Sequence, residues 1–358
     1  MMDRIVKQSL GIDVSKHSLS LCYGSLNLEM EREFKAHPEV KNDPEGFKIL
    51  LKWIRSQASK EVDFIVVMEA TGVYHQGIAA YLYEQGFNVS IMQSGRVKRY
   101  AQSLDQRSKT DALDSKMLSM LGLERKLRLW KPPVKELQLL KVLSRERSHL
   151  LKDKNVENNR YEAITSGIYL NADLTKRHKQ RIKLIEKQIA AVEKDMEALI
   201  IQSEDLSSKI KYMESIPGVS FITAATIAGE TLGIDAILNA KQLTSYAGYD
   251  VVQRESGNFR GKTRISKQGN AHIRAALHMP SMTCVRCNPT LQTFYLRLKT
   301  NKAKPLIALV AVQRKLLILM YTLWKNEEYY DPTYEIKKQQ KPMALAAQDS
   351  GINEYAAS

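Results

Sequence analysis

The sequence predicts a mixed α/β domain, then long helices, then a mainly α-helical C-terminal part. Three observations support this. Residues 1–130 alternate short β-branched runs with amphipathic stretches, the middle of the chain repeats apolar residues at helical spacing without glycine, and the last part is helical around one polar insert, Gln253–Asn270. With 358 residues, the chain is long enough for two or three domains.

The N-terminal elements follow a recognisable order. Three strands are expected close together, as in a meander, at Ser9–Ser15, Leu19–Tyr23 and Glu31–Ala36. Next come a helix at Gly46–Ser56, a buried strand at Asp63–Met68, a helix at Tyr74–Gln85, a strand at Asn88–Met92 and a helix at Thr110–Leu121. Three strands followed by alternating helices and strands fit an RNase H-like domain.

Pro132–Pro133 marks the end of the α/β region. Helices are expected over Val134–Ala163 and Leu174–Ile201, and the apolar stripe of the second is compatible with a coiled coil. Packing of this pair on its own chain and a dimer contact are equally open. The predicted domains are an α/β domain at 1–130, a coiled-coil linker or oligomerisation region at 131–210, a C-terminal domain at 211–330 and a flexible tail at 331–358.

Charge points to a polyanionic partner. The net charge is +15 and the pI is near 9.5, and each Lys or Arg set against a phosphate releases condensed counterions. The plain alternative is a basic soluble protein without such a partner. We therefore expect nucleic acid as the partner.

Nothing near Met1 is typical of a signal peptide. The most apolar stretch, Leu306–Trp324, is interrupted by Gln313, Arg314 and Lys315, which favours a buried helix over a membrane span. Three cysteines are too few for a disulfide framework, so a cytoplasmic location is expected.

Two carboxylates fall on predicted strands. Asp13 lies between Ile12 and Val14, which would point to the core while the aspartate faces the other side. Glu69 ends an apolar strand, and ligand sites of α/β sheets favour such carboxyl ends. A carboxylate on a strand is costly unless it is paired or binds a metal. Pairing with a basic neighbour is as good an explanation for either residue alone.

Two more carboxylates, Asp111 and Asp114, share one face of the helix that Thr110 would cap. Alone, they indicate an exposed acidic first turn, which the helix dipole favours. Together with Asp13 and Glu69, they favour a metal site. Mg²⁺ takes carboxylate oxygens, and two such ions can act on one phosphodiester.

Basic residues precede the acidic pair and also crowd the polar insert. The candidates for gripping a nucleic acid are Arg96, Lys98, Arg99, Arg107, Lys109, Arg254, Arg260, Lys262, Arg264, Lys267 and Arg274. Such runs are otherwise solvated faces. Ser256-Gly257 stands within the insert, where a hydroxyl among cations would meet a phosphate. The residues alone favour a turn serine, and Ser266, the nearest competitor, looks structural.

Ile216-Pro-Gly-Val219, followed by the helix-like run Ala224–Leu232, resembles a helix-hairpin-helix element. Amides at such a helix start suit a phosphate contact. A simple Pro-Gly turn between two helices is nearly as good an explanation.

The motifs together resemble a known family, the DEDD transposases of insertion sequences related to the Piv DNA invertase. The resemblance covers residues 8–325 and is carried by Gly11-Ile-Asp13-Val-Ser-Lys, Met68-Glu69-Ala-Thr-Gly, Lys109-Thr-Asp111-Ala-Leu-Asp114, Ser215-Ile-Pro-Gly-Val219, Tyr246-Ala-Gly-Tyr249, and Ser256-Gly with the following Gly261-Lys-Thr-Arg-Ile-Ser-Lys-Gln-Gly-Asn270. Tyr249-Asp250-Val251 is a less usual version of the segment before the serine.

This resemblance implies a RuvC-like domain joined through a coiled coil to a C-terminal transposase domain. It implies site-specific recombination of donor and target DNA, guided by a structured bridge RNA. Mg²⁺ would sit at Asp13, Glu69, Asp111 and Asp114, Ser256 would be the nucleophile, and the two parts would be shared between subunits of a dimer or tetramer.

Two other functions remain open. A metal-dependent, junction-resolving nuclease would need only the carboxylates, with water attacking. A non-catalytic nucleic-acid-binding protein would need neither the carboxylates nor Ser256. Ser256→Ala separates the first from a recombinase, and Asp13→Asn separates the second from both.

Overall fold

The computed structural model describes residues 4–59, 61–104, 110–253, 255–257, 259–261, 264–301 and 304–334. The chain divides into two compact units, residues 1–132 and 133–358, and each is described by itself. The tail predicted at 331–358 lies outside the described residues beyond Tyr334.

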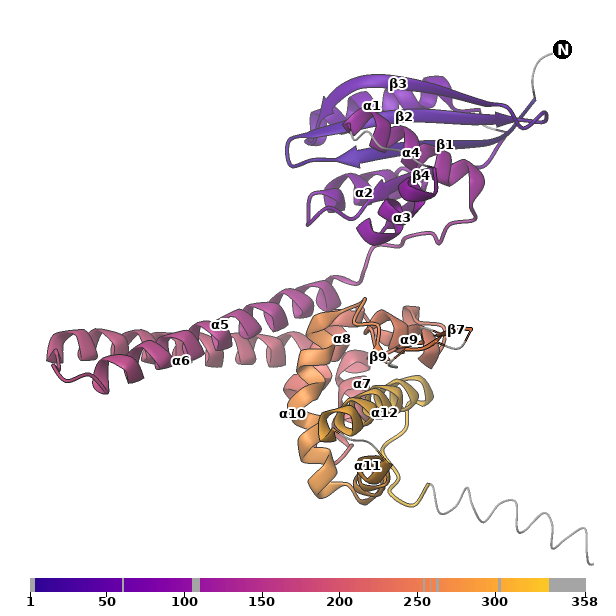
Figure 1. Ribbon diagram of the computed structural model, residues 1–358. Helices are drawn as coiled ribbons and strands as arrows, with labels where there is room; N and C mark the ends of the chain where they lie inside the picture. The colour runs from indigo at the N-terminus through magenta and orange to yellow at the C-terminus, as the bar shows by residue number, and fades with distance from the viewer. Residues whose placement is uncertain are drawn as a thin grey trace, which may run out of the picture. The chain divides into compact units, whose positions relative to one another are not determined.

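A five-stranded sheet forms the centre of the first unit (Figure 1). The order across it is β3-β2-β1-β4-β5; β1, β2 and β3 pair antiparallel, and β4 and β5 run parallel to β1. This mixed order is that of the RNase H-like fold, as predicted. The strands are β1 (Ile5–Val14), β2 (Ser18–Asn27), β3 (Arg32–Lys41), β4 (Phe64–Glu69) and β5 (Asn88–Met92).

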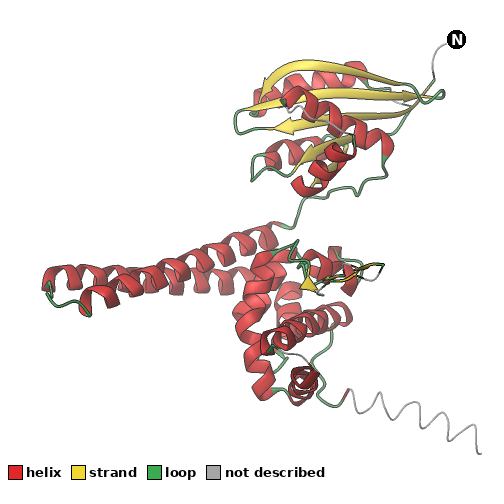
Figure 2. Cartoon of the chain, in the orientation of Figure 1, coloured by secondary structure: helices red, strands yellow, loops and turns green. Residues whose placement is uncertain are grey.

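Helices cover both faces of this sheet, with the strands between them in Figure 2. On one face, Leu10 and Ile12 of β1 are fully buried in a cluster with Leu50 and Ile78 of two helices. On the other, Val67 of β4 clusters with residues of two different helices. The first pair is α1 (Pro44–Gln57) and α2 (His75–Glu84), and the second is α3 (Ser94–Ser103) and α4 (Asp111–Glu124).

The second unit begins with a long helical hairpin, α5 (Lys135–Thr165) and α6 (Ala172–Ile201), whose helices lie side by side in Figure 1. Ion pairs fix their antiparallel register: Arg147 with Glu193 and Lys154 with Glu186. Asn171 caps the return helix by accepting from the amide of Leu174. Both helices were predicted to within two residues at each end.

The rest of the second unit is helical around four two-residue strands. Its helices are α7 (Glu204–Glu214), α8 (Phe221–Thr231), the short 3-10 helix η1 (Ile234–Ala236), α9 (Ala240–Tyr246), α10 (Ala271–Cys287), α11 (Pro289–Asn301) and α12 (Pro305–Asn326). Between α9 and α10 lie β6 (Val251–Val252), β7 (Glu255–Ser256), β8 (Phe259–Arg260) and β9 (Arg264–Ile265). One core cluster contains residues of α7, α8, α10 and α12.

Helix α12 is long and apolar enough to cross a membrane, and it is the one such helix among the described residues. Its Val312, Leu316 and Met320 are fully buried in the core cluster of the second unit. Helix α12 is therefore a core helix here, in line with the expectation for Leu306–Trp324.

Candidate active site

Asp13 and Glu69 come at the carboxyl ends of adjacent parallel strands. Ile12 of β1 pairs with Met68 of β4, and the two carboxylates are the next residues along each strand. Ile12 and Met68 are both fully buried on the face that α1 and α2 cover. Since successive side chains alternate between faces, Asp13 and Glu69 belong to the opposite face and lie next to each other along its edge.

Helix α4 covers that opposite face and runs antiparallel to β1. A Cβ at Gly11 would lie only 1.9 Å from the carbonyl oxygen of Ser115 and 2.4 Å from the amide nitrogen of Ser119, so the two backbones touch there. At the other end of α4, the Lys7 ammonium donates to the carbonyl of Leu123 (2.8 Å). The first turn of α4 therefore lies toward the carboxyl end of β1.

That first turn carries the acidic pair predicted from the sequence. The Thr110 hydroxyl accepts from the amide of Leu113 (3.2 Å), so Thr110 is the N-cap that was expected. Asp111 is exposed and Asp114 is half-buried. The antiparallel packing of α4 on β1 thus brings this pair toward the edge of the sheet where Asp13 lies, near the carboxyl end of β1.

The four carboxylates lie toward one edge of the sheet, but their side chains do not converge closely enough to coordinate one metal ion. Across the described part of the chain, no three acidic, histidine or cysteine side chains are close enough to hold a metal ion. Asp13, Glu69, Asp111 and Asp114 all belong to that part. Carboxylate oxygens are the ligands that Mg²⁺ prefers, so the donor set fits a magnesium site in chemistry.

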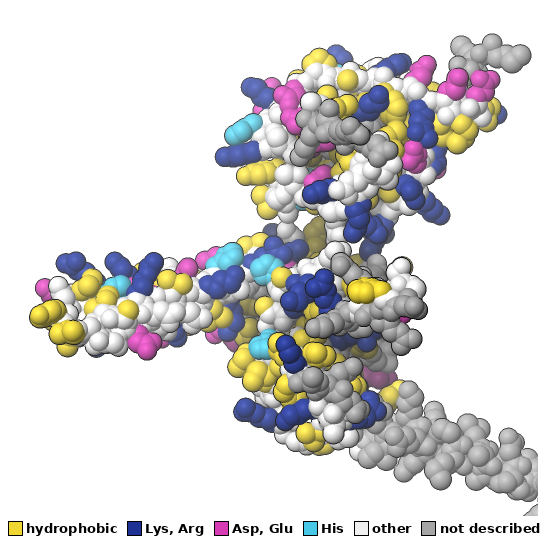
Figure 3. Space-filling model, in the orientation of Figure 1, with side chains coloured by type: hydrophobic (Ala, Val, Ile, Leu, Met, Phe, Trp, Pro, Cys, Tyr) yellow, Lys and Arg dark blue, Asp and Glu magenta, His cyan; other side chains and the backbone are white. Residues whose placement is uncertain are grey.

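Cations border this edge. Helix α3 starts two residues after Met92, which pairs with Glu69, and it exposes Arg96, Lys98 and Arg99 to solvent. Figure 3 shows Lys and Arg side chains over the visible faces of both units. The other two predicted cations of this region, Arg107 and Lys109, lie outside the described residues.

Ser256 lies in the second unit, exposed, on a short hairpin. It pairs with Phe259 of β8, and Gly257 takes a positive φ of 54° at the turn. The two-residue strands leave the serine at the end of a narrow projection. Its hydroxyl is therefore open to a substrate.

The predicted cations of this insert fall into three groups. Arg264 and Lys267 are exposed. Arg274 instead donates to the carbonyl of Ala247 (2.8 Å) and so helps to hold the base of the insert. Outside the described residues lie Arg254, Lys262 and the side chain of Arg260.

Ser266 also serves the base of the insert. Its hydroxyl donates to the Asp250 carboxylate (2.6 Å), and its amide donates to the Asp250 carbonyl (2.8 Å). These two bonds hold β6 next to β9. This position agrees with the structural role that was expected for Ser266.

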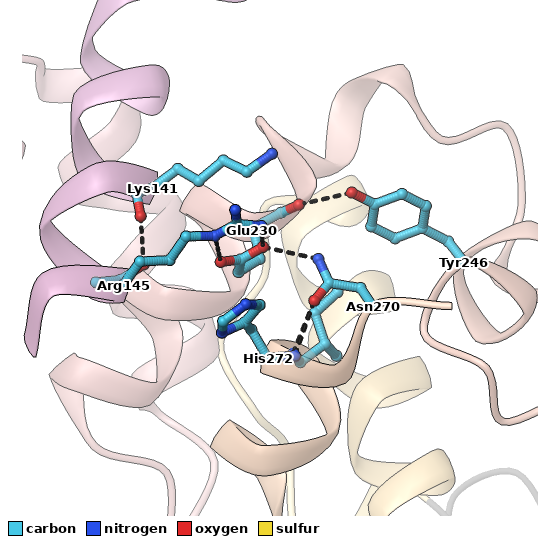
Figure 4. Close-up of polar contacts among 8 residues, drawn as sticks. Lys141, Arg145, Glu230, Tyr246, Asn270 and His272 are labelled. Atoms are coloured by element: carbon cyan, nitrogen blue, oxygen red, sulfur yellow. Dashed lines mark hydrogen bonds and ion pairs between the residues drawn. The ribbon is translucent and has the colours of Figure 1, made fainter. Parts of the chain in front are cut away.

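A buried polar cluster in the second unit was missed from the sequence (Figure 4). The Glu230 side chain on α8 is fully buried and accepts from Arg145 of α5 and from Asn270. One signal was available: Glu230 interrupts the apolar run of α8, where an ionised side chain is costly without partners. The same argument had singled out Asp13.

Two family models match successive parts of the chain and together cover more than half of it. The IS110-type DEDD model, described as "Transposase", matches residues 10–170. The model "Transposase IS116/IS110/IS902 family" matches residues 210–296. The chain is an IS110-type DEDD transposase.

Relatives agree along nearly the whole length. The transposase is 25% identical over 327 residues to the pilin gene-inverting protein of Moraxella bovis, which spans 91% of this chain and 98% of the relative. It is 22% identical over 253 residues to the transposase for insertion sequence element IS1111A of Coxiella burnetii, which spans 63% of this chain and 67% of that one.

Among solved structures, T. thermophilus RuvC in complex with a Holliday junction substrate aligns over 34% of the transposase and 99% of its own chain, with 11% identity and a TM-score of 0.28. The RNase H-like assignment rests on the strand order of the sheet. As a transposase of an insertion sequence, the protein is an enzyme that acts on DNA. The non-catalytic alternative is thereby excluded.

Proposed function

We propose that this transposase cleaves and exchanges DNA strands with two groups: a Mg²⁺ site at Asp13, Glu69, Asp111 and Asp114, and the nucleophile Ser256. One observation carries the proposal. Asp13, next to last in β1, and Glu69, last in β4, lie at the carboxyl ends of neighbouring strands on the face that α4 covers, and the first turn of α4 lies toward the same edge. A chance set of surface acids has no reason to gather at one edge of a sheet.

The metal part of the proposal follows from donor chemistry. Mg²⁺ held by these carboxylates would polarise phosphodiester oxygens and stabilise the charge that develops on the departing oxygen. The chain itself supplies the grip on DNA. Arg96, Lys98 and Arg99 are exposed on the helix that follows β5, so they would bind phosphates beside the carboxylates.

The serine part is a transesterification. The Ser256 hydroxyl attacks phosphorus, a serine–phosphate bond forms, the bond from phosphorus to one deoxyribose oxygen breaks, and the serine proton ends on that departing oxygen. The protein–DNA ester keeps the energy of the phosphodiester. Attack by a hydroxyl of a second strand then restores Ser256 and joins the strands, so no external energy source is needed.

The competing function is a junction-resolving nuclease in which water attacks and the carboxylates suffice. Ser256→Ala distinguishes the two. With Mg²⁺ and recombination substrates, the wild type should form a covalent protein–DNA product that peptide mass spectrometry maps to residue 256. Ser256→Ala should form none, whereas Ser166→Ala, at an exposed serine on the α5–α6 turn, should match the wild type.

If Ser256→Ala still cuts DNA at the wild-type rate, the serine proposal is wrong and the nuclease stands. Asp13→Asn and chelation of Mg²⁺ should each abolish both cutting and covalent product. Full activity of Asp13→Asn at saturating Mg²⁺ would instead refute the proposed metal site.

A structured RNA guide and an oligomeric assembly complete the proposal. The net charge of +15 supports binding of more than one polyanion. RNA that copurifies with the protein should be required for strand exchange, so ribonuclease treatment should abolish it and the same RNA added back should restore it. Sedimentation of the active complex should give a dimer or tetramer.

A further inference from the structure

The segment that carries Ser256 leaves the helical part of the second unit and returns to it at one point. It departs after Tyr246, the last residue of α9, and ends at Asn270, the residue before α10. The Asn270 amide donates to the Tyr246 carbonyl (2.8 Å), which closes the segment at its base. Gly269 is required there, because a Cβ would lie 2.5 Å from that same carbonyl oxygen.

Both ends of the segment are attached to Glu230. The Tyr246 hydroxyl donates to the Glu230 carbonyl (2.9 Å), and the Asn270 side-chain amide donates to the Glu230 carboxylate (2.7 Å). Figure 4 shows both of these side chains pointing toward Glu230 from the same side, with Arg145 on the other side. The side-chain oxygen of Asn270 meanwhile caps α10 by accepting from the amide of His272 (2.9 Å).

Glu230 is in turn held by α5. The Arg145 guanidinium donates to both carboxylate oxygens, at 2.7 Å through Nε and 3.0 Å through Nη2. Burial opposes the charge on Glu230, but the hydrogen bonds from Arg145 and Asn270 outweigh it and hold the pKa of this carboxyl below its ordinary value. A two-pronged pair of this kind fixes the plane of the carboxylate.

We propose that Glu230 is a positioning residue for Ser256: it fixes both ends of the serine-bearing segment against α5. The proposal rests on the function proposed above for Ser256. The segment has little structure with which to orient itself, since β6, β7, β8 and β9 are two residues long each. Only the Glu230 side of this ion pair is fully buried, since the Arg145 side chain is 40% exposed. An ion pair with a buried partner adds little net stability compared with apolar side chains, so a role in geometry accounts for this one better.

Asn270→Asp removes the hydrogen bond from the Asn270 side chain to Glu230 with little change in size. Aspartate also caps helices, so α10 keeps its cap, but the donor to Glu230 is replaced by an oxygen that repels it. Asn239→Asp is the matched control, because Asn239 caps α9 by accepting from the Gln242 amide and is not a hydrogen-bond partner of Glu230, whose partners are Arg145, Tyr246 and Asn270. We expect the rate of covalent DNA product to fall about tenfold or more in Asn270→Asp only, with unchanged DNA affinity.

A double variant reverses the hydrogen bond. In Glu230→Gln with Asn270→Asp, glutamine donates and aspartate accepts, so part of the lost rate should return. Tyr246→Phe removes the other attachment without changing charge and should lower the same rate in the same direction. A loss of DNA affinity in step with the rate would instead indicate general unfolding and overturn a positioning role.

A spin label separates this inference from the proposed chemistry. It is placed at Ser256→Cys in a Cys287→Ser background, because Cys287 is the exposed cysteine while Cys22 and Cys284 are buried. Label mobility should rise in Asn270→Asp and stay unchanged in Asn239→Asp, whether or not Ser256 attacks DNA. If the wild-type protein forms no covalent DNA product, the proposal that Ser256 is the nucleophile is wrong. If label mobility and reaction rate are both unchanged in Asn270→Asp, the proposed role of Glu230 is wrong.

Discussion

At the residue scale, the contact between Gly11 and α4 decides where the acidic pair lies. Any side chain at this position would overlap the backbone of Ser115, which would push the helix off the sheet. The Gly-Ile-Asp motif therefore has two roles. Asp13 supplies a carboxylate, and Gly11 admits the helix that brings Asp111 and Asp114 to the same edge.

Gly11→Ala should destabilise the first unit by about 1–3 kcal/mol, the usual cost of overpacking, and should also weaken Mg²⁺-dependent cleavage. Denaturant unfolding of the wild type and the variant gives the first quantity. Gly95→Ala in α3 is the control, because a Cβ at Gly95 would have no neighbouring atom within 4 Å, so this substitution should not lower the stability of the unit. Equal stability of Gly11→Ala and wild type would refute the close contact.

Glu230 should also contribute to the dependence of stability on pH. Because its pKa in the folded state is lowered, it stabilises the fold above its ordinary pKa, and this contribution is lost as the pH falls through the lowered value. As the pH falls below about 5, the free energy of unfolding should fall less steeply in Glu230→Gln than in the wild type. Parallel curves would contradict the assignment.

The sequence reveals a site residue when a charge interrupts an apolar pattern. Asp13 and Glu69 were selected as candidates in this way, and the pairing of β1 with β4 is what places them side by side. Glu230 carried the same signal, but its partners Arg145 and Asn270 are 85 and 40 residues away in the chain. No local pattern indicates such partners, so the cluster required the fold.

At the element scale, prediction succeeded where hydrophobic periodicity was strong. The strand Asn88–Met92 and the ends of α5 and α6 agree closely with the structure. Helix α3 was missed because it buries only Val97 and Tyr100 and is otherwise polar. The strands β6, β7 and β8 were not predicted, because two-residue strands are too short to show an alternating pattern. A bond distant in the chain, from Ser266 to Asp250, helps to hold β6 next to β9.

Glu157 determines how α5 and α6 meet near their connecting turn. It is buried between the helices and accepts from His178 (2.5 Å) and from Arg181 (3.3 Å). Glu157→Gln should therefore speed amide hydrogen exchange in the distal half of the hairpin roughly tenfold. Glu186→Gln, at a half-exposed ion pair with Lys154, should change it little; equal effects would show that burial of Glu157 is unimportant.

At the scale of the whole molecule, the charge of +15 is spread over both units. Affinity for DNA should therefore fall steeply with salt, and each phosphate contact removed should reduce the slope of log affinity against log salt by about 0.9. Lys98→Ala on α3 should show this reduction in a salt titration of binding. Lys187→Ala, at an exposed position on α6, should leave the slope unchanged. Equal slopes for the two variants would show that Lys98 on α3 does not contact DNA.

The division of the chain at Pro132 and Pro133 has a consequence for the host cell. If the carboxylates and Ser256 each do half of the chemistry, neither unit alone completes a reaction on DNA that it meets by chance. Under the proposed function, strand cleavage would require both units to act on the same DNA, so chance binding through one unit would leave the chromosome intact. A mobile element that must persist in its host would gain from such a division of the active site, with the carboxylates in the first unit and Ser256 in the second.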